Sequence, residues 1–252
     1  MTVWRLIPPL EVEGYLQMAI DEWLLEEHRR LRIPPTLRFY TWQPIAISLG
    51  YHQKRFPDFW QDLSWSGSKL ELVRRPSGGR GVLHQGDLTY ALVVSGVAGS
   101  RISAYRRICE FLIEGWRSLG VELVYGEAGR GYIRNPNCFA TATGADLVLP
   151  NGVKLIGSAQ LRRDRSILQH GSILLEPDLD LFAKVFGEEA PGEVLESLQG
   201  LSPRLNLRGE ALRRTVVEAL VEAAKGCFGV EFALQPLSEG EWEAIANFHR
   251  KP

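Results

Sequence analysis

The stretch DLVLPNGVKLIGSAQLRRDRSILQHGSILLE, residues 146–176, decides how this chain folds. Its Asn151-Gly152 pair is the strongest short-range signal for a β-hairpin turn, and β-prone residues lie on both sides of it. The pattern therefore predicts a hairpin over 146–160. The run SILQHGSILLE, residues 166–176, predicts a further strand with a kink at Gly171.

Lys154 lies just past the predicted turn. A two-residue loop would place Leu149 opposite Lys154 and Asp146 opposite Gly157, with Val153 and Leu155 on the other face from Lys154. A lysine in a hairpin is typically a solvated edge residue. Three small residues, 157–159, follow in the same strand, and we expect the gap that they leave on the sheet surface to be filled by something else.

Hydrophobic periodicity predicts the other elements. Helices are predicted at 14–31, 103–119, 178–187, 192–199, 209–226 and 239–248. Ser103 is the expected N-cap of the second helix, and Gly120 is expected just past its end. Strands are predicted at 70–75, 87–95 and 121–126, with two more over 36–51 that separate at Gln43-Pro44.

These elements predict an α+β fold. Helices and strands alternate without regular βαβ spacing and hairpins are frequent, which favours a mixed, largely antiparallel sheet flanked by helices. No convincing linker divides the chain, so we expect a single domain over 1–252 that is mainly helical from about 177.

Composition excludes several classes of protein. The chain has 252 residues, a net charge of −1 and 45% hydrophobic residues, so it lacks the basic excess of a nucleic-acid binder. The N-terminus has no apolar signal-peptide core, and no run is long enough for a membrane span. An odd, sparse count of three cysteines is not typical of a disulfide framework, and we expect a cytoplasmic protein.

The segment RRPSGGRGVLHQGDLTY, residues 74–90, is rich in glycine and arginine. It lacks the GK[ST] ending of a P-loop and the spacing of a dinucleotide fingerprint. Consecutive glycines still allow the backbone to approach a ligand closely and to present N–H groups to an oxygen. A simple turn between strands with surface arginines is the alternative, and His84 alone is more often structural than catalytic.

The three cysteines differ in their surroundings. Cys109 lies on the apolar face of a predicted helix and Cys227 follows another helix, so both are interpreted as packing residues. Cys138 follows Asn135-Pro136-Asn137 in a loop, where a substrate could reach it. A nucleophilic thiolate needs a nearby cation or base, but the sequence does not place Lys154 beside Cys138, and an inert cysteine stays open. Zinc-type spacings are missing.

A basic cluster, Arg162, Arg163 and Arg165, lies between the last two predicted strands. It is either a solvated turn or a docking site for an acidic partner.

Taken together, the motifs MAIDEWLL, LRFYTWQPIAISLGYHQ, RRPSGGRGVLHQGDLTYALV and VKLIGSAQLRRDRSILQHGSILLE resemble the lipoate/octanoate protein ligase and transferase family. That family shares its catalytic fold with biotin protein ligases, and the resemblance covers nearly the whole chain. The CF cysteine ahead of the lysine hairpin is most similar to the Gram-positive-type branch that transfers an octanoyl group from acyl carrier protein.

The resemblance implies roles for individual residues. Cys138 would hold the acyl group as a thioester, and Lys154 would lower the pKa of that cysteine. The acceptor would be a lysine of a lipoyl domain or of glycine-cleavage H protein, and no cofactor would be needed. The residues that would bind the acyl donor are Arg75, Ser77, Gly78, Gly79, Arg80, Gly81, Val82, Leu83, His84, Gly157, Ser158, Ala159, His170, Gly171 and Ser172.

Two segments depart from the family pattern. His84-Gln85 stands where the family usually has His-Asp, and ATATGADL follows Cys138 in place of a segment with an aromatic residue. Three alternative functions are therefore kept. They are an ATP- and Mg-dependent lipoate–protein ligase, an amidotransferase that moves the acyl group between lipoyl-domain proteins, and a non-catalytic acyl-binding relative.

Overall fold

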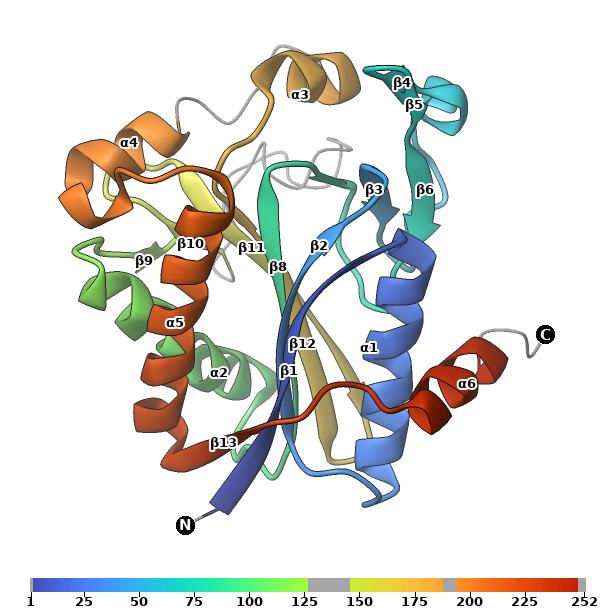
Figure 1. The fold of residues 1–252 in the computed structure, drawn as a ribbon, viewed down its shortest axis with the longest axis vertical. Helices are drawn as coiled ribbons and strands as arrows, with labels where there is room; N and C mark the ends of the chain where they lie inside the picture. The colour runs from blue at the N-terminus through green and yellow to red at the C-terminus, as the bar shows by residue number, and fades with distance from the viewer. Residues whose placement is uncertain (1, 127–145, 188–193, 249–252) are drawn as a thin grey trace.

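The computed structural model describes residues 2–126, 146–187 and 194–248, and a large twisted sheet forms its centre (Figure 1). Within these residues eight strands form that sheet, in the spatial order β13-β1-β2-β8-β12-β11-β10-β9. Their bounds are Thr2–Val12 (β1), Thr36–Trp42 (β2), Asp87–Ser95 (β8), Val124–Tyr125 (β9), Leu147–Val148 (β10), Lys154–Arg163 (β11), Ser166–Leu174 (β12) and Val230–Leu234 (β13).

Strand direction confirms the predicted fold class. β1 runs parallel to β2 and to β13, and each of the other neighbouring pairs in this sheet is antiparallel. β1 has no counterpart among the predicted elements. It contains Pro8-Pro9, which cannot donate ladder hydrogen bonds, and its register with β2 shifts between Ile7 and Leu10.

Smaller strands pair beside the large sheet. A three-stranded sheet has the order β6-β3-β7, and β4 and β5 form a short hairpin. The bounds are Ala46–Leu49 (β3), Ser64–Trp65 (β4), Ser68–Lys69 (β5), Glu71–Arg74 (β6) and Val82–His84 (β7). The two strands predicted over 36–51 are confirmed, but they belong to different sheets, β2 to the large one and β3 to the small one.

Helices cover both faces of the large sheet. α2 and α5 lie on one face, and α1 and α6 lie on the other (Figure 1). The helices are Gly14–Arg29 (α1), Arg101–Ser118 (α2), Leu179–Phe186 (α3), Val194–Leu201 (α4), Gly209–Phe228 (α5) and Glu239–Phe248 (α6), with 3-10 turns at Asp58–Asp62 and Pro203–Leu205. None of the described helices has both the length and the apolar character needed to cross a membrane.

The alternation of side chains along β8 explains why both faces are covered. Leu88, Tyr90 and Leu92 pack in the core beneath α2 and α5. Ala91 and Val93 point the other way, into the core beneath α1 and α6. Because successive side chains of a strand point to opposite faces, a strand that is apolar on both faces must be buried on both.

The register of the Asn151-Gly152 hairpin differs from the prediction. Val148, not Leu149, pairs with Lys154, whereas the pairing of Leu147 with Ile156 keeps the predicted register. The backbone N–H of Leu149 donates to Val153 O at 2.8 Å, so the turn is wider than two residues and the register shifts beyond it. Such a bulge redirects a side chain, and Lys154 is only 5% exposed instead of solvated at an edge.

Two smaller predictions also change. Ser100 caps α2, because its side chain accepts a hydrogen bond from the backbone N–H of Ser103, the residue that was expected to be the cap.

β12 does not kink at Gly171, since it stays in register with both neighbouring strands there. A Cβ at Gly171 would lie 2.5 Å from Ser158 Oγ and 2.7 Å from Gly157 O. Glycine at this position therefore allows β11 and β12 to approach each other closely.

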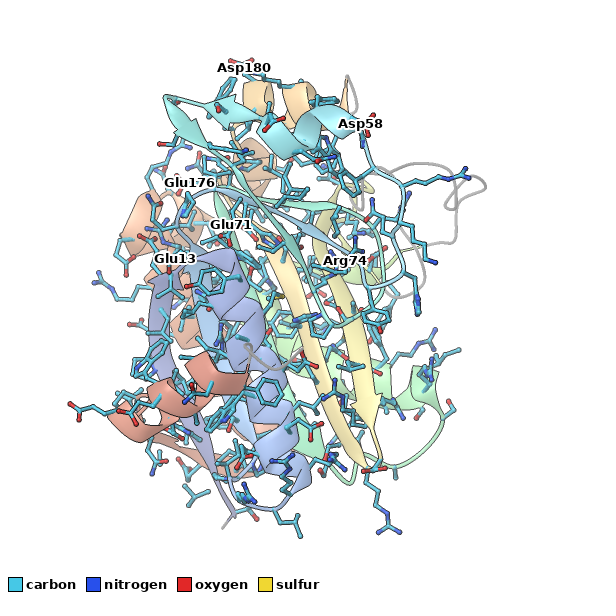
Figure 2. All side chains as sticks on the ribbon, turned by 90° about the vertical axis from the view of Figure 1, so that its right-hand side faces the viewer. Glu13, Asp58, Glu71, Arg74, Glu176 and Asp180 are labelled. Atoms are coloured by element: carbon cyan, nitrogen blue, oxygen red, sulfur yellow. The ribbon has the colours of Figure 1, made fainter. Side chains whose placement is uncertain are left out.

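The N-terminus of α1 is held by a residue distant in sequence. The carboxylate of Glu71, on β6, accepts hydrogen bonds from the backbone N–H groups of Gly14 (2.6 Å) and Tyr15 (3.0 Å). Glu13 is the N-cap residue by position, but its side chain makes no capping bond. Figure 2 labels Glu13 and Glu71, which lie together near the start of α1.

We predict that Glu71→Ala lowers the free energy of unfolding by about 1 kcal/mol, the typical cost of losing a helix cap. The carboxylate at this position also complements the positive end of the helix dipole. Glu13→Ala is the matched control and should change stability little. Urea unfolding followed by circular dichroism measures both variants, and equal losses would show that Glu71 does not act as a cap.

Candidate active site

A pocket lies between the large sheet and the three-stranded sheet. The residues that line it are Met18, Tyr40, Trp42, Ser48, Arg75, Gly79, Val82, His84, Thr89, Asp146, Lys154, Gly157, Ser158, Ala159, His170, Gly171 and Ser172.

Most of the residues expected to bind an acyl donor lie in this pocket. Of the expected set, the pocket is lined by Arg75, Gly79, Val82, His84, Gly157, Ser158, Ala159, His170, Gly171 and Ser172, with Lys154 beside them. Ser77 and Gly78 line a neighbouring groove. Arg80, Gly81 and Leu83 are buried and lie close to the lining residues in the sequence, but they do not line the pocket. The gap expected at 157–159 is therefore part of a cavity.

Lys154 forms a buried ion pair. Its Nζ lies 3.0 Å from Asp146 Oδ1, and the two side chains are only 3% and 5% exposed. The hairpin places both residues at the same end of the pocket, because β10 begins at Leu147 and β11 begins at Lys154. Removing either partner alone would break a buried ion pair, which is strongly destabilising.

A chain of polar contacts runs beneath the pocket through His84. Its Nδ1 lies 2.9 Å from Asp87 Oδ2, and its Nε2 lies 2.8 Å from Ser48 Oγ. The guanidinium of Arg75 donates to Ser48 Oγ at 3.1 Å. Because Asp87 accepts at Nδ1, the neutral ring carries its proton there, and Nε2 accepts the Ser48 hydroxyl.

Burial lowers the pKa of His84. The charge and hydrogen bond of Asp87 act in the opposite direction, and the charges of Arg75 and His170 lower the pKa further. The indole of Trp42 stacks on the ring, with centroids 3.8 Å apart and planes 15° from parallel. The imidazole of His84 is thus fixed by stacking on Trp42 and by hydrogen bonds at both ring nitrogens, and it stays neutral.

A second chain of contacts runs through His170. Its Nδ1 lies 2.8 Å from Asp21 Oδ2 on α1, and its Nε2 lies 2.5 Å from Ser77 Oγ in the glycine-rich loop. Tyr40 also donates to Asp21, at 2.9 Å. The Asp21 side chain is fully buried, so its charge depends on these partners and on Arg38, whose Nε lies 3.5 Å from Oδ1.

Arg75 holds the glycine-rich loop in shape. Its guanidinium donates to the carbonyl oxygens of Ser48 (2.8 Å), Gly78 (3.0 Å) and Arg80 (2.6 Å). Gly79 has a φ of +96°, and a Cβ there would lie 2.7 Å from Arg75 Nη2. A residue with a side chain could not occupy this position without strain, so Gly79 allows the arginine to reach the carbonyls.

Cys138 and the ATATG segment lie outside the described residues. Of the other two cysteines, Cys109 is fully buried on α2 as predicted, and burial raises the pKa of its thiol to about 12. Burial also raises the pKa of Cys227. Neither thiol is therefore prone to form the thiolate that nucleophilic chemistry needs. Among the residues that the structure describes, no three His, Cys, Asp or Glu side chains form a potential metal site.

Sequence reasoning missed the acidic partners of the site. Asp21 lies within an apolar run, MAIDEW, and a carboxylate in such a run signals a buried, paired charge, whereas Asp87 only begins the apolar run DLTYALVV. Asp146 carried no comparable signal, because it lies directly before a strand. Gln85, where the family usually has aspartate, accepts a hydrogen bond from the backbone N–H of Asp178 at 2.5 Å and does not line the pocket.

The fold is that of lipoate–protein ligases. A T. acidophilum protein named as a lipoate protein ligase, with bound lipoic acid, superposes with a TM-score of 0.76 at 22% identity, over 99% of this chain and 95% of that one. A lipoate-protein ligase A bound with ATP superposes with a TM-score of 0.73 at 22% identity, over 99% and 95%.

Sequence similarity defines the family. The family model described as lipoyl protein ligase A/B catalytic domain matches residues 13–224, and the chain belongs to this family. Octanoyltransferase LipM of Geobacillus kaustophilus is 38% identical over 93% of this chain and 88% of its own length. Octanoyltransferase LipM of Bacillus subtilis is 38% identical over 73% and 69%. That of Kyrpidia tusciae is 38% identical over 97% and 88%.

The buried state of His84 predicts a pH dependence of stability. A histidine whose pKa is lower in the folded chain than in the unfolded chain stabilises the fold above its unfolded pKa of about 6.5, and this contribution is lost as the pH falls. The difference in free energy of unfolding between the wild type and His84→Gln should therefore narrow between about pH 7.5 and pH 5. Urea unfolding at each pH measures it, and a difference that widens on acidification would contradict a neutral, buried His84.

Proposed function

We propose that this chain is an octanoyltransferase. It moves an octanoyl group from octanoyl-acyl carrier protein, through a thioester on Cys138, to a lysine of a lipoyl-domain protein or of glycine-cleavage H protein. The proposal places the protein in lipoate biosynthesis in the cytoplasm, with no cofactor required.

One structural observation carries the proposal most directly. The pocket is lined by the indole of Trp42 and the side chains of Met18 and Val82, and the buried pair of Lys154 and Asp146 lines it as well. Apolar side chains beside a buried cation suit a short acyl chain with a reactive carbonyl. The relatives named octanoyltransferase LipM support the same substrate class.

The reaction would proceed in two steps. A Cys138 thiolate attacks the thioester carbonyl carbon, and the carrier thiolate leaves and takes up a proton. The neutral ε-amine of the acceptor lysine then attacks the acyl-enzyme, an amide bond forms, the amine loses a proton and the Cys138 thiolate is released. Backbone N–H groups of the glycine-rich loop would stabilise the oxyanion of each step. Lys154 would provide the cation that lowers the pKa of the thiol.

The ion pair complicates a test of Lys154, because Lys154→Met alone leaves a buried carboxylate without its cation. The double variant Lys154→Met/Asp146→Leu removes both charges. It should fold, and it should form the acyl-enzyme at least tenfold more slowly than the wild type, since the thiol would lose a charge worth at least ~1 pKa unit.

The decisive test of the function is the intact mass after incubation with octanoyl-carrier protein and no ATP. The wild type and the control Cys227→Ser should each gain one octanoyl group that hydroxylamine removes, and Cys138→Ser should gain none. Labelling of a lipoyl domain that requires ATP and survives Cys138→Ser would contradict the transferase and identify a ligase. The absence of any labelling in the wild type would contradict the transferase and leave the amidotransferase and the non-catalytic relative as the alternatives.

A further inference from the structure

A second cavity, open to solvent, lies next to the pocket described above, which we call the acyl pocket. We call the second cavity the arginine groove. Arg75 lines both cavities, whereas Ser77 and Gly78 in the glycine-rich loop line only the arginine groove. The residues that line the arginine groove are Glu22, Tyr51, His52, Arg74, Arg75, Pro76, Ser77, Gly78, Arg101, Gln160, Leu161, Arg162 and Arg163.

Two of its five arginines are already committed to other groups. Arg75 donates to loop carbonyls, as described above. Arg163 is paired with Glu22 and with Glu26, the latter at 2.6 Å. The expected docking cluster of Arg162, Arg163 and Arg165 is therefore divided, since Arg163 is neutralised and Arg165 does not line the groove.

The other three arginines have no acidic partner among the described residues. Arg74 donates to the carbonyl oxygens of Gly50 (2.7 Å) and Gln53 (2.9 Å), which leaves its charge uncompensated. Arg162 has only long contacts of 3.4 Å, to Gln160 and to the carbonyl of Arg101. Arg101 is the first residue of α2, where the helix dipole adds further positive potential. The protein as a whole has a net charge of −1, so this potential is local.

β11 joins the two cavities. Ser158 and Ala159 line the acyl pocket, and Gln160, Leu161 and Arg162 line the arginine groove. Ser158 and Arg162 are four residues apart, which is about 13 Å along a strand. A ligand that occupies both cavities thus needs an apolar chain at one end and an anion at the other.

We propose that the arginine groove binds the phosphodiester of the carrier's phosphopantetheine arm. The inference rests on the proposed function, because it takes an acyl thioester as the occupant of the neighbouring pocket. The acyl chain then lies in the pocket while arginines, whose guanidinium forks suit phosphate oxygens, hold the anion.

Binding of two uncleavable thioethers tests this assignment without any acyl transfer. S-octyl-phosphopantetheine and S-octyl-pantetheine differ only in the phosphate, and calorimetry measures both. The wild type should bind the phosphorylated compound about tenfold more tightly, because charge-assisted contacts to phosphate are strong. This preference should shrink as the salt concentration rises.

Arg101→Gln/Arg162→Gln should reduce the preference to about twofold or less and leave binding of S-octyl-pantetheine unchanged. Arg165→Gln is the matched control and should behave like the wild type. Equal binding of the two compounds to the wild type, or a full preference in the double variant, would overturn the assignment.

Failure of the proposed function is distinguishable from failure of this inference. A phosphate preference that depends on Arg101 and Arg162 in a protein that forms no acyl-enzyme would support the groove and contradict the transferase. An acyl-enzyme formed with unchanged KM for octanoyl-carrier protein in the double variant would support the transferase and contradict the groove.

Discussion

One buried carboxylate, Asp21, joins the parts of the molecule that make the pocket. It projects from α1, accepts hydrogen bonds from Tyr40 on β2 and pairs with His170 on β12. His170 in turn contacts Ser77 in the glycine-rich loop. A fully buried charge is tolerated only when such partners surround it, so the helix, the sheet and the loop must come together for any of them to be stable.

Asp87 organises the opposite side of the pocket in a similar way. It accepts hydrogen bonds from His84 (2.9 Å) and from Ser172 (2.7 Å), and it thereby connects the small sheet to β12. The pocket therefore lies between two fixed Asp–His pairs, with Lys154 and Asp146 at its end. Because each member of these pairs has its rotamer and tautomer set by hydrogen bonds, the walls are preorganised for a ligand.

Local sequence patterns predicted the positions of helices and strands better than they predicted the contacts between them. Apolar spacing was sufficient for α1, and the β-prone run at 87–95 coincides with β8. The register at Lys154 was wrong because a bulge beyond a wide turn depends on how the hairpin packs. The Glu71 cap, 57 residues from Gly14, and the Asp21–His170 pair, 149 residues apart, depend on the completed fold. For the site, the glycine-rich loop and the small residues 157–159 were predictable, and their acidic partners were not.

In the reaction proposed above, the acyl chain would lie between the two sheets, with its carbonyl at Lys154. A crystal structure of the protein with S-octyl-pantetheine bound would test this placement most directly. We expect the octyl chain to contact Trp42 and the backbone of 157–159, with its sulfur at the Lys154 end of the pocket. An octyl chain bound elsewhere, with the pocket left to solvent, would show that this pocket is not the acyl site.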